Sequence, residues 1–416
     1  FYFFFFFGYN TGLGWNSLNS NSTGYYNTTI GFNSLYNNTT GYQNTAVGFK
    51  SLTLNTIGIE NTASGWSSLF SNTTGNYNTA SGSSSLFFNT TGSKNTAVGY
   101  ASLFNNTTGS ENTALGLGTL QWNTEGTCNT AMGIQSLFLN TTGVDNTAVG
   151  YQSLSSNTVG FQNTAVGYQS LNYNSTGDGN TALGVSSLKY NTTGYQNTAL
   201  GSASLHDNTT GSRNTAIGVY SGYLITTGKN NTAIGYYAQV PSGAADNQVR
   251  IGDEFITYAG VQVAWTITSD KRLKSDIKNS DLGLNFISKL NPVSYTRNND
   301  EKKKIEYGLI AQEVEDVLKD SGVENAGMLT IDDSGRYELR YNDLLAPMIK
   351  AIQELKKEKD VEIAELKTAN DELKSTTFEL KERLSKIEQM QKMLVTEIEK
   401  LKINNNETTK VSLGEK

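Results

Sequence analysis

The residues best suited to chemistry in this sequence are a serine and a lysine five positions apart, Ser269 and Lys274. A serine hydroxyl becomes a nucleophile when a base takes its proton, and a lysine amine serves as that base when it is neutral. Because an ordinary lysine has a pKa of about 10.4, burial or a nearby cation must lower it to roughly 7–8. Lys271 and Arg272 supply cations nearby in the sequence. The pair predicts a nucleophile that becomes active only after assembly has buried its base.

The composition gives little support to other kinds of site. A single His (His206) and a single Cys (Cys128) exclude a His-based triad, a two-His or multi-Cys metal site and an internal disulfide within one chain. The net charge of −6 gives no general reason to expect nucleic acid, because phosphate binding needs clustered Lys and Arg. No apolar run approaches the ~20 residues of a membrane helix. We therefore expect no metal, no cofactor, no nucleic-acid partner and no membrane span.

The serine and lysine open a series of motifs that runs over about 90 residues. The motifs are Ser269-Asp270-x-Arg272-x-Lys274-x-Asp276-Ile277, Gly283-Leu284-x-x-Ile287-x-x-Leu290-x-Pro292-Val293-x-Tyr295, Gly308-Leu309-Ile310-Ala311-Gln312-Glu313-Val314, Tyr341-x-x-Leu344 and Ala351-Ile352-Gln353-Glu354-Leu355. In order and spacing they resemble the C-terminal intramolecular chaperone of phage tailspikes and tail fibres. That family consists of Ser–Lys autoproteases that also occur on bacterial surface proteins and on one eukaryotic membrane-bound transcription factor.

The resemblance implies that the chain cuts itself between Thr268 and Ser269. Ser269 would be the nucleophile and Lys274 its base, with Asp270 and Arg272 as supporting residues. The alternative for this stretch is a charged, solvated loop without chemistry. The chain departs from the family at Lys319-Asp320-Ser321-Gly322, where a Pro usually follows the Gln-Glu-Val helix. This departure bears on the local loop and not on the dyad.

The chain before this module is a repeat in which an Asn recurs every 17 residues. The consensus is N-T-A-x-G-x-x-S-L-x-x-N-T-T-G-x-x, and we number the coil positions from its first Asn. A fixed period of this length indicates stacked coils that bury their faces against one another. We expect β coils, with strands in the Thr-Ala-Val and Ser-Leu segments, an Asn ladder, and Gly and Asn at positions that tolerate positive φ. The repeat begins at Asn10, Asn27, Asn44, Asn61, Asn78, Asn95, Asn112, Asn129, Asn146, Asn163, Asn180, Asn197, Asn214 and Asn231.

Each coil offers a thin apolar core, one Leu, one Ala and one variable aliphatic residue. At ~25 cal/mol per Å² of buried apolar surface, this barely offsets the entropy of ordering the coil. We therefore expect three chains side by side, similar in style to the β-roll heads of trimeric autotransporter adhesins. The shaft alone fits a spacer. Two other readings are ice binding through its Thr ranks, or a host-surface receptor or glycan bound through the aromatic sixth position (Phe32, Phe49, Trp66, Tyr100, Tyr151 and Tyr168).

After the repeat, the residue pattern of the chain changes twice. Val249–Asp253 and Ile256–Trp265 predict two or three strands of a collar, with Trp265 as its core plug. From Ile363 a heptad pattern places an aliphatic residue at every d position, which predicts a coiled coil. The a positions are Ile363, Asn370, Thr377, Leu384, Gln391 and Ile398; the d positions are Leu366, Leu373, Leu380, Ile387, Leu394 and Leu401.

The fold class we expect is a mainly β repeat shaft, then a small α/β chaperone domain, then a trimeric coiled coil. Its function would be that of a virion tail fibre or bacterial cell-surface fibre. Its chaperone assembles a homotrimer and then cuts itself off in cis, once, as a serine endopeptidase. A non-cleaving surface adhesin is the alternative. The expected divisions are 1–9, a truncated or disordered start; 10–238, the repeats; 239–268, a β neck; 269–350, the chaperone; 351–403, the coiled coil; and 404–416, a disordered tail.

Overall fold

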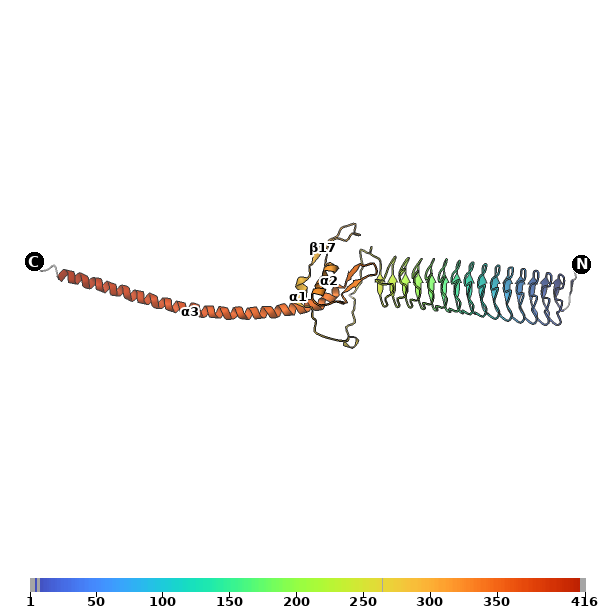
Figure 1. Ribbon diagram of the computed structural model, residues 1–416, viewed down its shortest axis with the longest axis horizontal. Helices are drawn as coiled ribbons and strands as arrows, with labels where there is room; N and C mark the ends of the chain where they lie inside the picture. The colour runs from blue at the N-terminus through green and yellow to red at the C-terminus, as the bar shows by residue number, and fades with distance from the viewer. Residues whose placement is uncertain (1–3, 6–7, 264, 412–416) are drawn as a thin grey trace. The chain divides into compact units, whose positions relative to one another are not determined.

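The computed structural model describes residues 4–5, 8–263 and 265–411 (Figure 1). These residues form two units, which we describe separately. The first consists of residues 1–265 with 298–302 and 330–337, and the second of 266–297, 303–329 and 338–416.

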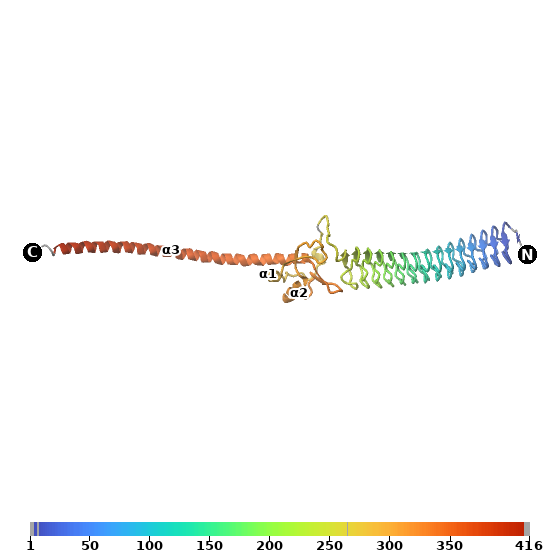
Figure 2. The same cartoon turned by 90° about the horizontal axis from the view of Figure 1, so that it is seen from above.

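The repeat forms a β-solenoid in which each 17-residue interval is one coil (Figures 1 and 2). Thr147 pairs with Thr164 and Ala148 with Ala165 in a parallel sheet whose strands follow in chain order. The predicted β coils are therefore confirmed. The strands are β2 Thr11–Leu13, β3 Thr28–Ile30, β4 Thr45–Val47, β5 Thr62–Ser64, β6 Thr79–Ser81, β7 Thr96–Val98, β8 Thr113–Leu115, β9 Thr130–Met132, β10 Thr147–Val149, β11 Thr164–Val166, β12 Thr181–Leu183, β13 Thr198–Leu200, β14 Thr215–Ile217 and β15 Thr232–Ile234.

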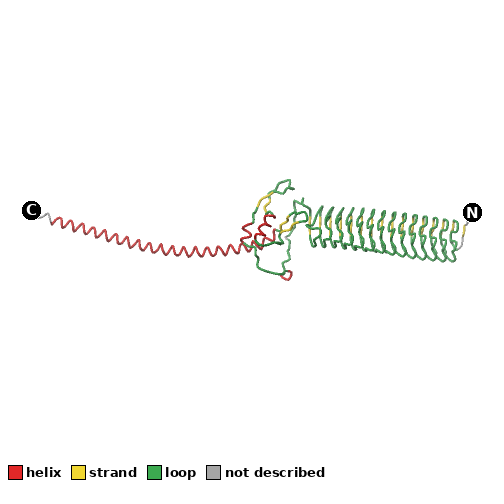
Figure 3. The backbone as a smooth tube through the Cα atoms, viewed as in Figure 1, coloured by secondary structure: helices red, strands yellow, loops and turns green. Residues whose placement is uncertain are grey.

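Only the Thr-Ala-x segment of each coil is a strand, and the rest is turn and loop (Figure 3). The prediction of a second strand at Ser-Leu is wrong. In the coil that begins at Asn163, Leu171 has a φ of +48°, in the left-handed region, so the chain turns there. The Leu side chain is fully buried in that turn. Burial of the Leu outweighs the roughly 1–2 kcal/mol that this conformation costs.

The core of the solenoid closes within a single chain. The Leu and Ala of successive coils, such as Leu154 and Ala148, have no exposed surface. The Asn at position one, such as Asn146, is equally buried, and so is the Asn at position twelve, such as Asn157. Burial of the core therefore does not require neighbouring chains, and the thin core is no longer an argument for a trimer.

The buried Asn side chains form two ladders, as the repeat predicted. Asn146 Oδ1 accepts from the backbone N–H of Asn163 at 3.0 Å and from its Nδ2 at 3.2 Å. Asn146 Nδ2 donates to Gly160 O at 2.8 Å. In the second ladder, Asn157 Nδ2 donates to Asn140 Oδ1 at 2.8 Å. Each amide thus satisfies backbone groups that the narrow coil leaves without strand partners.

Positive φ is found at only one of the four positions where we expected it. Gly150, at position five, has a φ of +133°. The Gly at position fifteen and the two Asn do not adopt positive φ in the coils. Gly160 is required for a different reason: a Cβ there would lie 2.4 Å from Asn157 Oδ1 and 2.5 Å from Gly177 O. The two Asn residues of each coil contribute hydrogen bonds from their side-chain amides and do not contribute an unusual backbone conformation.

The ends of the solenoid differ from the expected boundaries. At its start, β1 (Phe4–Phe5) pairs antiparallel with β2, inside the segment expected to be truncated or disordered. Residues 1–3 and 6–7 lie outside the described residues. At its end, β16 (Val249–Ile251) pairs in parallel with β15, so this neck strand extends the solenoid sheet.

The rest of the neck has no strand among its described residues, 252–263 and 265–268. The prediction of strands in Ile256–Trp265 is therefore wrong for the part of it that the structure describes. Trp265 is 75% exposed, so within one chain it plugs no core. A collar of three chains stays a prediction.

The second unit carries the predicted α/β module. It contains helix α1 (Leu284–Lys289), strands β17 (Val293–Tyr295) and β18 (Glu306–Gly308) and helix α2 (Ala311–Asp320). β17 and β18 pair antiparallel, and Phe286, Val314 and Leu318 form the core of the module. Strand β19 (Leu329–Ile331) pairs with β20 (Tyr337–Leu339), and residues 330–337 of this pair belong to the first unit. Two short 3₁₀ helices complete the module, η1 (Lys271–Leu273) and η2 (Tyr341–Leu344).

One long helix, α3 (Leu345–Val411), forms the tail (Figure 1). Residues 404–411 are helical, so the prediction of disorder from 404 is wrong for them, and 412–416 lie outside the described residues. The heptad side chains are not buried by any of the residues that the structure describes: Leu366 is 63% and Leu373 is 66% exposed. This apolar seam is what a coiled coil would bury.

Candidate functional site

The two predicted catalytic side chains meet. Lys274 Nζ lies 2.6 Å from Ser269 Oγ, within hydrogen-bond distance. This is the reach that a general base needs in order to take the serine proton. Both residues belong to the second unit, so the contact does not depend on how the two units are arranged.

A single turn of 3₁₀ helix brings the two side chains together. Residues Lys271–Leu273 form η1, and Asp270 caps it by accepting from Arg272 N at 2.9 Å. Lys274 follows as the C-cap, and its backbone N–H donates to Lys271 O at 3.2 Å. Since the 3₁₀ helix has about three residues per turn, one turn brings the chain back to the side of Ser269. The spacing of five residues thus has a local structural cause.

Asp270 and Arg272 form an ion pair beside the dyad. Arg272 Nη2 lies 2.6 Å from Asp270 Oδ2, and Arg272 Nε lies 3.1 Å from the same oxygen. Hydrogen bonds from Arg272 hold the pKa of Asp270 below its ordinary value, and the carboxylate raises the pKa of Arg272. Because Asp270 balances the charge of Arg272, the unbalanced cation next to the dyad in sequence is Lys271. The two supporting residues therefore shape the turn.

The Ser269–Lys274 pair and the bond between Thr268 and Ser269 are exposed to solvent in the single chain. Thr268, Ser269 and Lys274 are all on the surface. Desolvation favours the neutral form of a lysine, so burial is what would prepare this amine for use as a base. None of the described residues of the single chain buries Lys274.

Two further contacts connect motifs that are distant in sequence. Glu354 Oε2 accepts from the backbone N–H of Leu284 at 2.7 Å, so α3 caps α1. This hydrogen bond holds the pKa of Glu354 below its ordinary value, against a smaller opposing effect of burial. Likewise, Tyr341 Oη accepts from Leu309 N at 2.8 Å. All four residues lie in the family motifs, but the sequence alone gave them no role. The signal for these two contacts was that two motifs contain a Gly-Leu pair and two later motifs contain a Glu and a Tyr.

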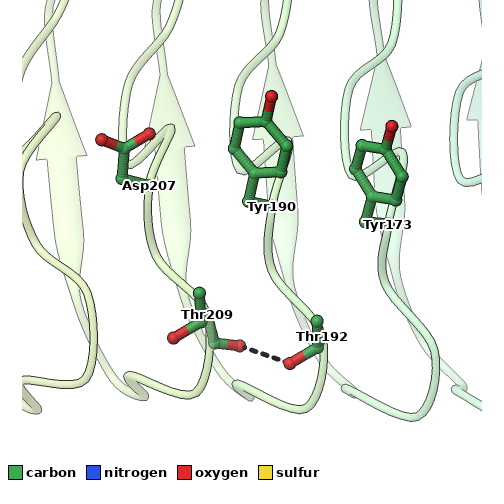
Figure 4. A pocket seen from close by; sticks show the side chains of 5 residues that line it. All are labelled: Tyr173, Tyr190, Thr192, Asp207 and Thr209. Atoms are coloured by element: carbon green, nitrogen blue, oxygen red, sulfur yellow. Dashed lines mark hydrogen bonds between the residues drawn. The ribbon is translucent and has the colours of Figure 1, made fainter.

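The shaft carries a shallow surface groove of about 450 Å³ (Figure 4). Tyr173 and Tyr190 line it at position eleven of successive coils, and their rings stack at 5.3 Å between centroids. Asp207 occupies the same position in the next coil, and Thr192 and Thr209 form the opposite side (Figure 4). The groove is not at the aromatic sixth position that the sequence analysis proposed as a receptor site.

Residues 269–323 match the family model Peptidase_S74, the chaperone of endosialidase. The match begins at Ser269, the predicted nucleophile, and covers η1, α1, β17, β18 and α2. This confirms the resemblance inferred from the motifs, for a module that follows a β-solenoid of about fourteen 17-residue coils. Searches of curated proteins and of solved structures gave no significant match.

Over 4–5, 8–263 and 265–411, no group of three His, Cys, Asp or Glu side chains is arranged to hold a metal ion. Within the same residues, no helix combines the length and the apolar character needed to cross a bilayer.

Proposed function

We propose that this protein is a trimeric fibre whose C-terminal module acts as an intramolecular chaperone and then cuts itself off between Thr268 and Ser269. The family match over 269–323 and the solenoid before it support a tail-fibre-like trimerisation chaperone. The observation that carries the cleavage is the 2.6 Å contact between Lys274 Nζ and Ser269 Oγ at the first residue of the matched segment. Such a fibre would belong to a virion tail or to a bacterial cell surface.

The proposed reaction is an acyl shift followed by hydrolysis. Neutral Lys274 takes the proton from Ser269 Oγ, which attacks the carbonyl carbon of Thr268 and forms a five-membered tetrahedral intermediate. The C–N bond then breaks, the Ser269 nitrogen takes the proton back from Lys274, and Thr268 is left as an ester on Ser269 Oγ. Water hydrolyses this ester, which gives a Thr268 carboxylate and restores the serine hydroxyl. One water is consumed, and the enzyme acts once on itself.

Assembly would control this reaction through burial. Three α3 helices that pack along the heptad seam bring three modules together. Neighbouring modules would then cover the exposed Lys274 and favour its neutral form. After release, the shaft would have lost the module that helped it fold, so its persistence would depend on slow unfolding.

The decisive experiment compares the wild-type chain with Ser269→Ala and Lys274→Arg on a denaturing gel, with intact masses. We expect fragments 1–268 and 269–416 from the wild type and whole chains from both variants. Arg retains the positive charge but stays protonated, so it cannot act as a base. Hydroxylamine should trap the ester as a hydroxamate on Thr268. Cleavage of Ser269→Ala at the same bond would overturn the proposal, and an uncut wild-type trimer would favour the non-cleaving adhesin.

A second function, binding of a host-surface glycan, is favoured by the groove of Figure 4. Tyr173 and Tyr190 supply aromatic surface, and the Asp207 carboxylate can accept hydrogen bonds from sugar hydroxyls. Aromatic surface beside a few polar groups is the usual composition of small-molecule sites. Screening the intact fibre on a glycan array, with Tyr190→Ala as the paired variant, tests this function. Equal binding by the two proteins would exclude the groove.

A further inference from the structure

Six consecutive positions of the solenoid coil carry no charged residue, although the Lys50 ammonium, at position seven, lies 5.3 Å from the centroid of the Phe49 ring at position six. The charged residues of the coils before residue 239 fall at positions seven, ten, eleven, fourteen, sixteen and seventeen of the repeat. None falls at positions one to six, although those six positions recur in every coil. If these positions faced only water, a charged residue at one of them would change the stability of the shaft very little. Water alone therefore does not explain why charge is absent from them in every coil. The charged residues are Lys50, Glu60, Lys94, Glu111, Glu125, Asp145, Asp178, Lys189, Asp207, Arg213 and Lys229.

Two columns of apolar side chains run along these positions. Position four, the last strand residue, is aliphatic in nearly every coil, and Val166 and Leu200 are 37% and 45% exposed there. Position six is mostly aromatic or aliphatic, and Trp66 and Tyr100 are 54% and 61% exposed. Position four holds Leu13, Ile30, Val47, Ser64, Ser81, Val98, Leu115, Met132, Val149, Val166, Leu183, Leu200, Ile217 and Ile234; position six holds Trp15, Phe32, Phe49, Trp66, Ser83, Tyr100, Leu117, Ile134, Tyr151, Tyr168, Val185, Ser202, Val219 and Tyr236.

The two columns form one apolar band because only glycine separates them. Position five is Gly, as at Gly150, where a Cβ would lie 2.4 Å from the carbonyl oxygen of Gly167 in the next coil. The side chains within the sixth column also stack: the rings of Phe32 and Phe49 are 5.4 Å apart, and those of Tyr151 and Tyr168 are 5.3 Å apart. The band therefore runs through thirteen of the fourteen coils and is interrupted in the coil that begins at Asn78, where Ser81 and Ser83 occupy the two columns.

The exposed area of the band is large for a surface that faces only water. An aromatic side chain offers roughly 150–250 Å² when fully exposed, so a half-exposed ring leaves about 100 Å² per coil. Over the length of the shaft this exceeds the few hundred Å² of the largest apolar patch on a typical monomer. It also reaches the ~800 Å² that each partner buries in a standard interface. Depletion of charge is the compositional mark of the core of such an interface.

We infer that this band is the seam along which copies of the shaft pack against one another in the fibre. The occupant is a second copy of this chain, because the band repeats with the coil spacing over its whole length. A partner must have the same spacing to match it, and another shaft in register does. A receptor or a glycan would need only a short segment and would favour polar groups. The inference rests on the trimer proposed above and names the surface that holds the shafts together.

Thiol labelling of the full-length Ser269→Ala chain tests the seam, with Cys128 replaced by Ser as background. The matched variants are Val166→Cys in the band and Val159→Cys at position fourteen, where Val159 is 48% exposed. In the native trimer, a bulky water-soluble maleimide should label Cys at 166 at least about tenfold more slowly than Cys at 159, because it reacts only when the seam opens. Both should react alike after unfolding.

Light scattering on the same samples separates the two proposals. Trimers in which both thiols react at equal rates would overturn the seam and leave the trimer intact. Monomers would overturn the trimer itself. Adding Leu380→Asp in the heptad should abolish the slow reaction at 166, because it removes the helix that gathers the chains. Slow labelling that survives in monomers would assign the protection to the coil and overturn the seam.

Discussion

Lys274 Nζ and Ser269 Oγ are held 2.6 Å apart by one turn of 3₁₀ helix, and the cap of that turn is Asp270. Local structure within one chain thus forms the contact on which the proposed dyad depends. What the single chain lacks is burial, since both side chains are exposed. In the proposed reaction, formation of the Ser269–Lys274 contact and activation of the lysine by burial are therefore separate events, and mutations should separate them.

Replacing Asp270 with Ala should slow the cleavage without stopping it. The variant loses the cap of η1 and leaves Arg272 without its carboxylate, and loss of an N-cap typically costs about 1 kcal/mol. We expect the rate to fall roughly three- to tenfold, measured as the fraction of cut chain over time. Asp270→Asn, which keeps the acceptor for Arg272 N, should stay closer to the wild type. A wild-type rate for Asp270→Ala would show that the turn does not set the geometry.

The contact between α1 and α3 should weaken in acid. The Leu284 N–H holds the pKa of Glu354 below its ordinary value of 4.5 in the folded state. The contribution of Glu354 is therefore fully present above pH 4.5, and it is lost as the pH falls through the lower folded-state pKa. Hydrogen exchange of the α1 amides should show less protection in Glu354→Gln than in the wild type at pH 7, and little difference in strong acid. A difference that is independent of pH would contradict this role. Glu358→Gln on the same helix is the control.

Substitution of Gly150 by Ala should destabilise the shaft. Its φ of +133° and the contact of a Cβ with Gly167 O at 2.4 Å leave no room for a side chain. Backbone strain of this kind costs about 1–3 kcal/mol, before the clash is counted. Thermal unfolding should show a lower Tm than for Thr142→Ala, an exposed residue of the same shaft. Equal melting temperatures would mean that the glycine column is not closely packed.

The Asn ladder should be sensitive to single substitutions. Asn146→Ala removes the donor to Gly160 O and the acceptor for Asn163 N, both buried, at about 1–3 kcal/mol for each unsatisfied group. Asn146→Asp should be worse near neutral pH, because its carboxylate would be buried and would face the Gly160 oxygen.

Burial would raise the folded-state pKa of that new Asp above its unfolded value. The deficit of Asn146→Asp relative to the wild type should therefore shrink as the pH falls through the raised value. Chemical denaturation of the shaft at pH 4 and pH 7 measures this change. A deficit that grows in acid would exclude a buried carboxylate at this position.

Disruption of the heptad should prevent both assembly and cleavage. Leu380 lies at a d position and is 59% exposed in the single chain, so Leu380→Asp would place a charge in the coiled-coil seam. We expect monomers by light scattering and an uncut chain by intact mass. Glu382→Lys, two residues further on the outer face, should leave both unchanged. Full cleavage in monomeric Leu380→Asp would show that activation does not require other copies.

The sequence by itself determined the repeat, the contact between Ser269 and Lys274, and the heptad pattern, because each depends on short-range order. A period of 17 residues places Asn146 beside Asn163 in any stacked arrangement, so the ladder followed from spacing. A spacing of five positions, with the N-cap residue Asp270 inside it, brings Lys274 to Ser269 through one local turn. The backbone conformations of the coil were less predictable, because burial of Leu171 imposes positive φ on a residue that ordinarily avoids it.

Only the tertiary structure decided which groups that are distant in sequence form hydrogen bonds with one another. Nothing local predicts that Glu354 caps α1 at Leu284, seventy residues earlier, since a cap of this kind depends on where α3 passes. Nor does the period say whether the core closes within one chain. The side chains turn inward or outward only once the coil has closed, and closure buries Leu and Ala while it leaves positions four and six exposed. Spacing determines which residues stack, whereas the folded path of the chain determines which of them face water.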